Sequence, residues 1–316
     1  MALEKKLIKE IVNITSKAAI SCYKFVGKND KISADRAATD SMRNEINKIQ
    51  MNGKVVIGEG ELDEAPMLYI GETLGAGGDL KLDIAVDPLE GTNFVAKNLP
   101  GALSVISISE QGNLFNAPET YMDKLAVSNK VPFDATDLDF PVEKNVKNIA
   151  ESLNKDITKV NVCLLNRPRH KKIIDQLKHM NVQIKLISDG DVSGALMVTN
   201  EKYNVDLFIG IGGGPEGVLA ASAIDAFNCK FQGRFIFSSE KDISRAMKMG
   251  IKDLKKKYEL KEIVKGDSIF CATGITTGEL VKGIKVEGNK FTTETFVTHK
   301  SSNMSEIVIS EDTIKT

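Results

Sequence analysis

The feature that most constrains the fold is a regular alternation of apolar runs and helical patterns between residues 160 and 227. Short runs rich in Val, Ile and Leu predict strands at 160–165, 182–188 and 205–211, and helices are predicted at 168–180, 191–199 and 215–227. Strands that alternate with helices in this way are typical of βαβ units. We therefore predict an α/β fold with a partly parallel sheet.

The rest of the chain shows a looser mixture of the same elements. An amphipathic helix is predicted within residues 1–20 and a second helix at 33–50. Strands are predicted at 54–57, 80–86, 104–109 and 125–127, and further strands with glycine-containing turns at 269–298. The segment 131–148 contains two prolines and dense charge with weak periodicity, so we predict a linker or an exposed excursion there.

Length and composition set limits on the class of protein. The 316 residues, of which 42% are hydrophobic and 27% charged, suit one large α/β unit or two lobes that share a cleft. The net charge of -1 gives no overall footprint for nucleic acid. No stretch is apolar enough for a signal peptide or a membrane span. Four widely spaced cysteines, three of them in apolar runs, favour a reducing, cytoplasmic setting.

Acidic residues and glycines recur where apolar runs end, which is where α/β folds build their sites. A single acidic residue in such a place is more often a turn former or a helix cap. As a set, however, carboxylates need a cation to neutralise them, and their hard oxygen atoms suit Mg²⁺ or Mn²⁺. With only three histidines in the chain, a histidine-based zinc site is disfavoured. The residues concerned are Glu59, Glu61, Asp83, Asp87, Glu90, Asp189, Asp191 and Glu216.

The segment Asp87-Pro88-Leu89-Glu90-Gly91-Thr92 is the hardest of these to explain as a turn alone. Two carboxylates flank a rigid proline, and a glycine and a hydroxyl follow at the expected start of a new element. Metal ligation, close approach of the backbone to a ligand and a phosphate-facing turn would all fit there. We predict that the chemistry of the protein centres on this segment.

At these residues the chain resembles the class II fructose-1,6-bisphosphatases, a family within the lithium-sensitive, metal-dependent phosphatases. The DPLEGT segment follows GEGELDEAPMLYIGE, and the order continues through YMDKLAV, NRPRH, ISDGDVSGA, GIGGGPEGVLAA and ATGITTGELVKG. The resemblance covers roughly residues 20 to 285. One such motif is moderately specific, whereas the full ordered set is highly specific.

The resemblance implies a layered αβαβα sandwich with a metal-binding lobe at 1–155, a substrate lobe at 156–316 and an active site in the cleft between them. It implies hydrolysis of the 1-phosphate of fructose 1,6-bisphosphate with two or more Mn²⁺ or Mg²⁺ ions, in a homodimer or homotetramer. Its metal ligands would be Asp35, Glu59, Asp87, Glu90 and Glu216, and its catalytic residues Thr92 and Asp63. Its substrate contacts would be Glu90, Gly91, Thr92, Tyr121, Arg167, Arg169, Asp189, Asp191 and Gly213.

Elementary chemistry is consistent with these roles. We expect Thr92 to hold the attacking water, with Asp63 as its hydrogen-bond partner or base. The guanidinium groups of Arg167 and Arg169 suit the phosphate that is not cleaved. Asp189 and Asp191 would accept hydrogen bonds from sugar hydroxyls, and Tyr121 would cover the sugar or pack in the core.

Other functions remain open at this stage. Sedoheptulose 1,7-bisphosphate is the nearest alternative substrate, alone or alongside fructose 1,6-bisphosphate, because the motifs do not separate the two sugars. Inositol monophosphatase is disfavoured by Glu90, where that family usually has Asp, and by the two arginines. A non-catalytic sugar-phosphate sensor is disfavoured by Thr92. The chain departs from the family pattern around Asp35 and at Asn93-Phe94, and we expect Phe94 to shape the edge of the site.

Overall fold

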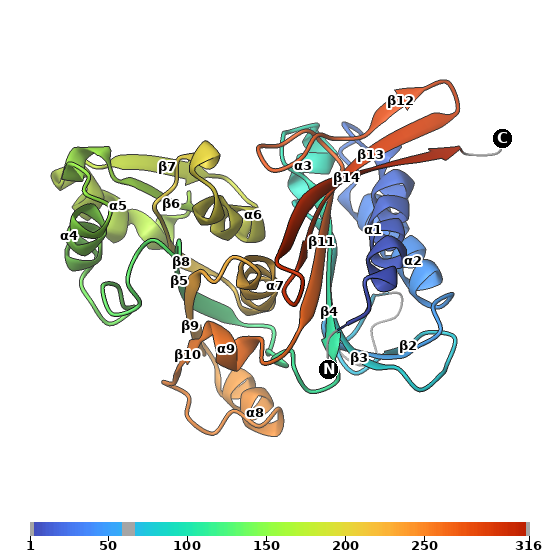
Figure 1. Ribbon diagram of the computed structural model, residues 1–316, viewed down its shortest axis with the longest axis horizontal. Helices are drawn as coiled ribbons and strands as arrows, with labels where there is room; N and C mark the ends of the chain where they lie inside the picture. The colour runs from blue at the N-terminus through green and yellow to red at the C-terminus, as the bar shows by residue number, and fades with distance from the viewer. Residues whose placement is uncertain (1–2, 59–66, 314–316) are drawn as a thin grey trace. The chain divides into compact units, whose positions relative to one another are not determined.

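The computed structural model describes residues 3–58 and 67–313, which form two compact units. Unit 1 comprises Met1–Phe115 and Val264–Thr316, and unit 2 comprises Asn116–Ile263. Unit 1 is thus discontinuous in sequence, since the chain leaves it after residue 115 and returns at 264 (Figure 1). These bounds differ from the predicted division at residue 155, which falls inside unit 2.

Unit 1 is a two-layer structure in which helices cover one face of an eight-stranded sheet. The strand order is β12-β13-β11-β4-β3-β1-β2, and β14 pairs with β13. Its helices are α1 (Lys6–Tyr23), α2 (Lys31–Ile46) and α3 (Thr92–Lys97). Its strands are β1 (Asn52–Ile57), β2 (Thr73–Leu74), β3 (Lys81–Glu90), β4 (Leu103–Glu110), β11 (Ser268–Gly274), β12 (Lys285–Glu287), β13 (Lys290–His299) and β14 (Met304–Thr313).

Helix α1 forms because its apolar residues recur at helical spacing. Leu7, Ile11 and Ile14 are almost fully buried in one core cluster with aliphatic residues of β3, β4 and β11. Each such side chain contributes about 1.5–3 kcal/mol when it leaves water. The predicted helix at the N-terminus is therefore confirmed, as is the strand that leads into the segment 87–92, although β3 extends to Glu90.

Unit 2 is a three-layer structure around a six-stranded sheet in the order β10-β9-β5-β8-β6-β7. Strands β6, β7 and β8 are parallel, whereas β5, β9 and β10 pair antiparallel. Its strands are β5 (Tyr121–Val127), β6 (Asn161–Leu165), β7 (Gln183–Ile187), β8 (Leu207–Gly213), β9 (Lys230–Ile236) and β10 (Lys257–Glu259). Its α-helices are α4 (Val142–Ser152), α5 (Lys171–His179), α6 (Asp191–Leu196), α7 (Gly214–Asp225), α8 (Glu240–Lys248) and α9 (Leu260–Ile263).

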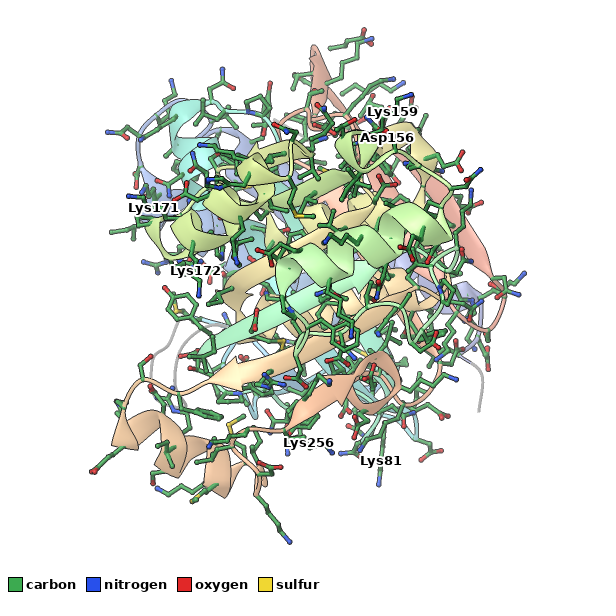
Figure 2. The ribbon with its side chains drawn as sticks, turned by 90° about the vertical axis from the view of Figure 1, so that its left-hand side faces the viewer. Lys81, Asp156, Lys159, Lys171, Lys172 and Lys256 are labelled. Carbon is green, nitrogen blue, oxygen red and sulfur yellow. The ribbon has the colours of Figure 1, made fainter. Side chains whose placement is uncertain are left out.

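Short 3-10 turns connect several elements of unit 2: η1 (Ile157–Lys159), η2 (Pro168–His170), η3 (Met197–Thr199) and η4 (Glu201–Tyr203). Helices α4 and α5 cover one face of the sheet, and α6 and α7 cover the other (Figure 1). Figure 2 looks onto the first of these faces, where Lys171 and Lys172 mark the first turn of α5. The parallel strands predicted from the alternation are confirmed, and so is the mixed α/β class.

The predicted linker at 131–148 is wrong in its second half. Helix α4 begins directly after Pro141, and its residues Val142, Val146 and Ile149 are buried against β5 and β6 in the core. These three positions follow helical spacing. The pattern was not recognised because charged residues lie between them and because the predicted segment ended at 148, before Ile149.

The three cysteines that lie in apolar runs are buried, as is Cys22, and all four are free. None of the helices in the described part of the chain is both long and apolar enough to cross a bilayer.

Candidate active site

In unit 1 the predicted segment forms the end of β3 and the turn into α3. Glu90 is buried at the end of the strand, and the Asp87 carboxylate accepts a hydrogen bond of 3.2 Å from the Leu89 N–H. Gly91 has φ 83°, in the left-handed region that favours glycine. A Cβ atom there would also lie only 2.8 Å from Cδ2 of Phe94. The turn that presents Thr92 at the start of α3 therefore requires a glycine.

Phe94 lies in the core beneath this turn rather than at an exposed edge. Its side chain is 8% exposed and packs in a cluster with Leu89 and Val95. Its N–H donates a 2.8 Å hydrogen bond to the Gly91 carbonyl. Phe94 consequently acts on the segment by supporting the Gly91 backbone.

Asp35 lies in the second turn of α2, which packs against β3 and α3. Its Oδ1 atom is buried and has no hydrogen-bond partner among the residues that the structure describes. Burial raises the pKa of this carboxyl above its ordinary value. A buried carboxylate oxygen without a donor is unfavourable by itself, whereas a bound cation would satisfy it. Asp35 is therefore a candidate metal ligand.

Two predicted site residues, Glu59 and Asp63, lie outside the described residues. Among the residues that are described, no group of three or more His, Cys, Asp or Glu side chains is arranged to hold a metal ion. Of the remaining predicted ligands, Asp35, Asp87 and Glu90 belong to unit 1 and Glu216 belongs to unit 2. The oxygen donors present are those that Mg²⁺ and Mn²⁺ prefer.

In unit 2, predicted residues lie at the start of β5, the end of β8 and the starts of α6 and α7. Asp191 is the first residue of α6 and is buried, and Glu216 lies in the first turn of α7. Burial raises the pKa of the Glu216 carboxyl, the positive charge of Lys124 opposes this increase, and the charge of Asp191 adds to it. Two acidic groups therefore share one region with a single buried lysine.

The glycines before α7 leave room for these carboxylates. A Cβ atom on Gly212 would lie 2.0 Å from Oδ2 of Asp191, and one on Gly213 would lie 1.8 Å from Oε2 of Glu216. Any other residue would displace a carboxylate. These two contacts explain why glycines stand at positions 212 and 213.

The predicted arginines lie at the turn after β6. Arg167 donates to the Ser188 carbonyl and forms an ion pair of 3.6 Å with the Asp189 carboxylate. Arg169 donates a 2.9 Å hydrogen bond to the Ile211 carbonyl, and its guanidinium carbon lies 4.8 Å from the centre of the Tyr121 ring. Since Tyr121 is exposed, its ring has not packed into the core. The arrangement brings two cations, one aromatic ring and one carboxylate to the same edge of the sheet.

His170 supports this turn and was not singled out from the sequence. It is fully buried, and its Nε2 accepts a 2.7 Å hydrogen bond from the Ile211 N–H. Its Nδ1 must therefore carry the proton and donate to the Leu165 carbonyl, also at 2.7 Å. Burial lowers the pKa of His170, so the neutral ring is favoured. The ring ties the end of β6 to β8 directly beside Arg169.

Lys124 is the second residue that sequence reasoning missed. It is fully buried in β5, and its Nζ donates to the Asp191 carboxylate and, at 2.6 Å, to the Gly213 carbonyl. A lysine is usually exposed, so its type gave no signal. The alternation of β5 did give one, since Lys124 shares a face of the strand with Met122 and Ala126, both buried.

The α/β framework thus carries carboxylates on glycine turns, a hydroxyl at a helix start and a pair of arginines. These groups are typical of an enzyme that acts on phosphate esters with carboxylate side chains in its site. The chain belongs to a particular family of that class. The family model for bacterial fructose-1,6-bisphosphatase, glpX-encoded, matches residues 5–312.

Curated relatives agree with this membership. The chain is 40% identical to the D-fructose 1,6-bisphosphatase class 2/sedoheptulose 1,7-bisphosphatase of Synechococcus sp. (strain JA-2-3B'a(2-13)), over 95% of this chain and 93% of that protein. It is 38% identical to fructose-1,6-bisphosphatase 1 class 2 of Escherichia coli (strain K12), over 93% of this chain and 91% of that protein. Among solved structures, an inositol monophosphatase from Anabaena (Nostoc) sp. PCC 7120 aligns at 12% identity and a TM-score of 0.33, covering 62% of this chain and 71% of that one.

Proposed function

We propose that this chain is a phosphoric monoester hydrolase that removes the 1-phosphate of D-fructose 1,6-bisphosphate to give fructose 6-phosphate and phosphate, as in gluconeogenesis. The observation that carries the proposal is the family match over residues 5–312, which includes every motif of the candidate site. The arginines and carboxylates of unit 2 support it, because a sugar bisphosphate offers both phosphate oxygens and hydroxyls to be bound.

The metal ligands in this proposal are Asp35, Asp87, Glu90 and Glu216, together with Glu59. The buried Oδ1 of Asp35, for which the described part of the chain supplies no hydrogen-bond partner, supports the assignment. Two or more Mn²⁺ or Mg²⁺ ions bound to such carboxylates would lower the pKa of a water molecule and neutralise phosphate oxygens.

The other residues bind and orient the reactants. Thr92, at the start of α3, holds the attacking water by its hydroxyl, with Asp63 as its hydrogen-bond partner or base. The backbone at Gly91 lies close to the phosphate because the turn has no side chain there. Orientation of this kind contributes to catalysis by bringing the water and the phosphorus into line.

The substrate residues of unit 2 act on the sugar and on the uncleaved phosphate. Arg167 and Arg169 bind that phosphate through their guanidinium groups, and the exposed ring of Tyr121 covers the sugar. Asp189 and Asp191 accept hydrogen bonds from sugar hydroxyls. Gly213 contributes to the same contact surface, since it pairs with Tyr121 across β5 and β8.

Sedoheptulose 1,7-bisphosphate is a second candidate substrate. The printed name of the Synechococcus relative joins both activities, and that protein is 40% identical to this chain. Both sugars carry a phosphate at each end, so the paired arginines and the carboxylates suit either.

Release of phosphate from a substrate panel tests the proposal. The panel holds fructose 1,6-bisphosphate, sedoheptulose 1,7-bisphosphate, fructose 6-phosphate and inositol 1-phosphate, each with Mn²⁺, with Mg²⁺ and with a chelator. We expect turnover of at least the fructose bisphosphate, dependent on metal. Binding of the bisphosphate without turnover under either ion would instead support the sugar-phosphate sensor, and preference for inositol 1-phosphate would refute the bisphosphatase.

A homodimer or homotetramer in the cytoplasm belongs to the same proposal. The free state of all four cysteines supports a reducing compartment. Light scattering coupled to gel filtration measures the oligomeric state directly, and a monomer at micromolar concentration would contradict the assembly.

A further inference from the structure

Lys124 is a charged residue in the core of unit 2, and its exposure is 0%. It lies in the middle of β5, a strand that has neighbours on both sides, β8 and β9. A buried ammonium group is unfavourable unless charged or polar partners surround it. The position therefore demands an explanation from its contacts.

Those contacts all lead to residues that the proposed function uses. Nζ forms an ion pair with the Asp191 carboxylate at the start of α6. It also donates a 2.6 Å hydrogen bond to the carbonyl of Gly213, the last residue of β8. The charge of Lys124 acts in addition on Glu216 in the first turn of α7. One ammonium group thus connects three elements that carry proposed sugar and metal contacts.

Helix α7 packs closely against β5 around Lys124. A Cβ atom on Gly217 would lie 2.6 Å from Sδ of Met122 and 3.5 Å from Cδ of Lys124. A Cβ on Gly213 would meet the Glu216 carboxylate at 1.8 Å. The lysine stem thus packs beside α7, and its head reaches the Asp191 carboxylate and the Gly213 carbonyl.

We infer that Lys124 is a positioning residue of this site: it holds Asp191, Gly213 and Glu216 in place without touching the substrate. The inference rests on the proposed function, because Asp191 and Gly213 are its sugar contacts and Glu216 is one of its metal ligands. Groups behind the ligands of a site set the orientation of those ligands, and their loss weakens binding while the fold persists.

The same sheet supplies a matched control, Lys230. This lysine is also buried, at 3% exposure, and lies in β9 opposite Val127 of β5. Its Nζ donates to the backbone carbonyls of Phe133 and Thr136, neither of which belongs to the proposed site. Removal of either lysine leaves buried acceptors unsatisfied, but only Lys124 is connected to the site.

The experiment compares Lys124→Met, Lys124→Arg and Lys230→Met in the full chain. Steady-state hydrolysis of fructose 1,6-bisphosphate gives kcat, KM and the Mn²⁺ concentration for half-maximal activity, and thermal unfolding gives Tm. In Lys124→Met we expect both KM and the half-activating Mn²⁺ concentration to increase about tenfold or more. Lys124→Arg, which keeps the charge but places it differently, should lie between the parent and Lys124→Met.

Lys230→Met should lose a similar amount of Tm and keep KM and Mn²⁺ activation within about threefold of the parent. Equal effects of the two Met substitutions, or an unchanged KM in Lys124→Met, would overturn the inference. If Lys124→Met does not fold, the KM of Lys124→Arg is compared with that of the parent, and an unchanged KM overturns the inference. A parent protein without turnover refutes the proposed function instead, and Lys124 is then tested by the thermal shift that fructose 1,6-bisphosphate and Mn²⁺ produce in each variant.

Discussion

Replacement of His170 by alanine should destabilise unit 2 through the loss of a buried bridge. The ring accepts one hydrogen bond of 2.7 Å from the Ile211 N–H and donates another of 2.7 Å to the Leu165 carbonyl. Each bond contributes about 1 kcal/mol net, and each buried partner left unsatisfied costs about 1–3 kcal/mol. We therefore expect the free energy of unfolding to fall by about 3 kcal/mol, which allows for partial access of water to the gap.

Urea unfolding followed by circular dichroism measures this loss. With a slope of about 2 kcal/mol per M, the midpoint should decrease by about 1.5 M. Hydrogen exchange should localise the effect, since the amide of Ile211 loses its acceptor. The control is His179→Ala on the exposed end of α5. Its Nδ1 bonds to the Asp175 carbonyl of its own helix, so the substitution should change stability by less than about 0.5 kcal/mol.

The same variant has a second signature in its pH dependence. Burial lowers the pKa of His170 in the folded protein, whereas the unfolded chain has the ordinary value of about 6.5. As the pH falls below about 6.5, the unfolded chain therefore binds a proton that the folded chain does not, and the parent loses stability. His170→Ala lacks this loss, so the difference between the two proteins should narrow. The bridge would be refuted if the free energies of unfolding of the parent and His170→Ala differed by less than about 1 kcal/mol at neutral pH. It would also be refuted if their difference stayed constant on acidification.

Three further predictions concern activity. Thr92→Ala should lower kcat about hundredfold with KM within about threefold of the parent, and Thr92→Ser should recover most of the loss; an unchanged kcat excludes a role in holding water. Arg167→Ala should raise KM for fructose 1,6-bisphosphate about tenfold or more, and a pure kcat effect would contradict contact with the uncleaved phosphate. Gly213→Ala should raise the Mn²⁺ concentration for half-maximal activity about tenfold, because its Cβ would lie 1.8 Å from Glu216; unaltered activation by Mn²⁺ would show that Glu216 does not bind the ion.

Local patterns predicted the elements that bury one clear apolar face. The helix at the N-terminus and the parallel strands β6, β7 and β8 belong to this group. Strand β9 was missed, because Lys230 and Gln232 make it look exposed although both are buried. Their polar groups are satisfied by partners more than ninety residues away in sequence, Phe133 for Lys230 and Leu138 for Gln232.

Buried acidic residues illustrate the same limit. Asp83 is buried and accepts hydrogen bonds from the N–H groups of Gly112 and Leu114, so it stabilises a turn. Asp35 and Asp83 are both carboxylates in unit 1; Asp83 accepts from backbone N–H groups, whereas Oδ1 of Asp35 has no donor within residues 3–58 and 67–313. Nothing in the residue type distinguishes a turn former from a candidate ligand. The donors around each carboxylate make the distinction.

The sequence by itself determined the family, the mixed α/β class and the ordered motifs of the site, since these depend on residue types in a fixed order. The division into units was decided only by tertiary structure, because β11 lies between β4 and β13 and returns the end of the chain to unit 1. Strand pairing of this kind depends on burial between distant segments, which local periodicity does not record. The same holds for Lys124, whose role depends on partners that only folding brings to it.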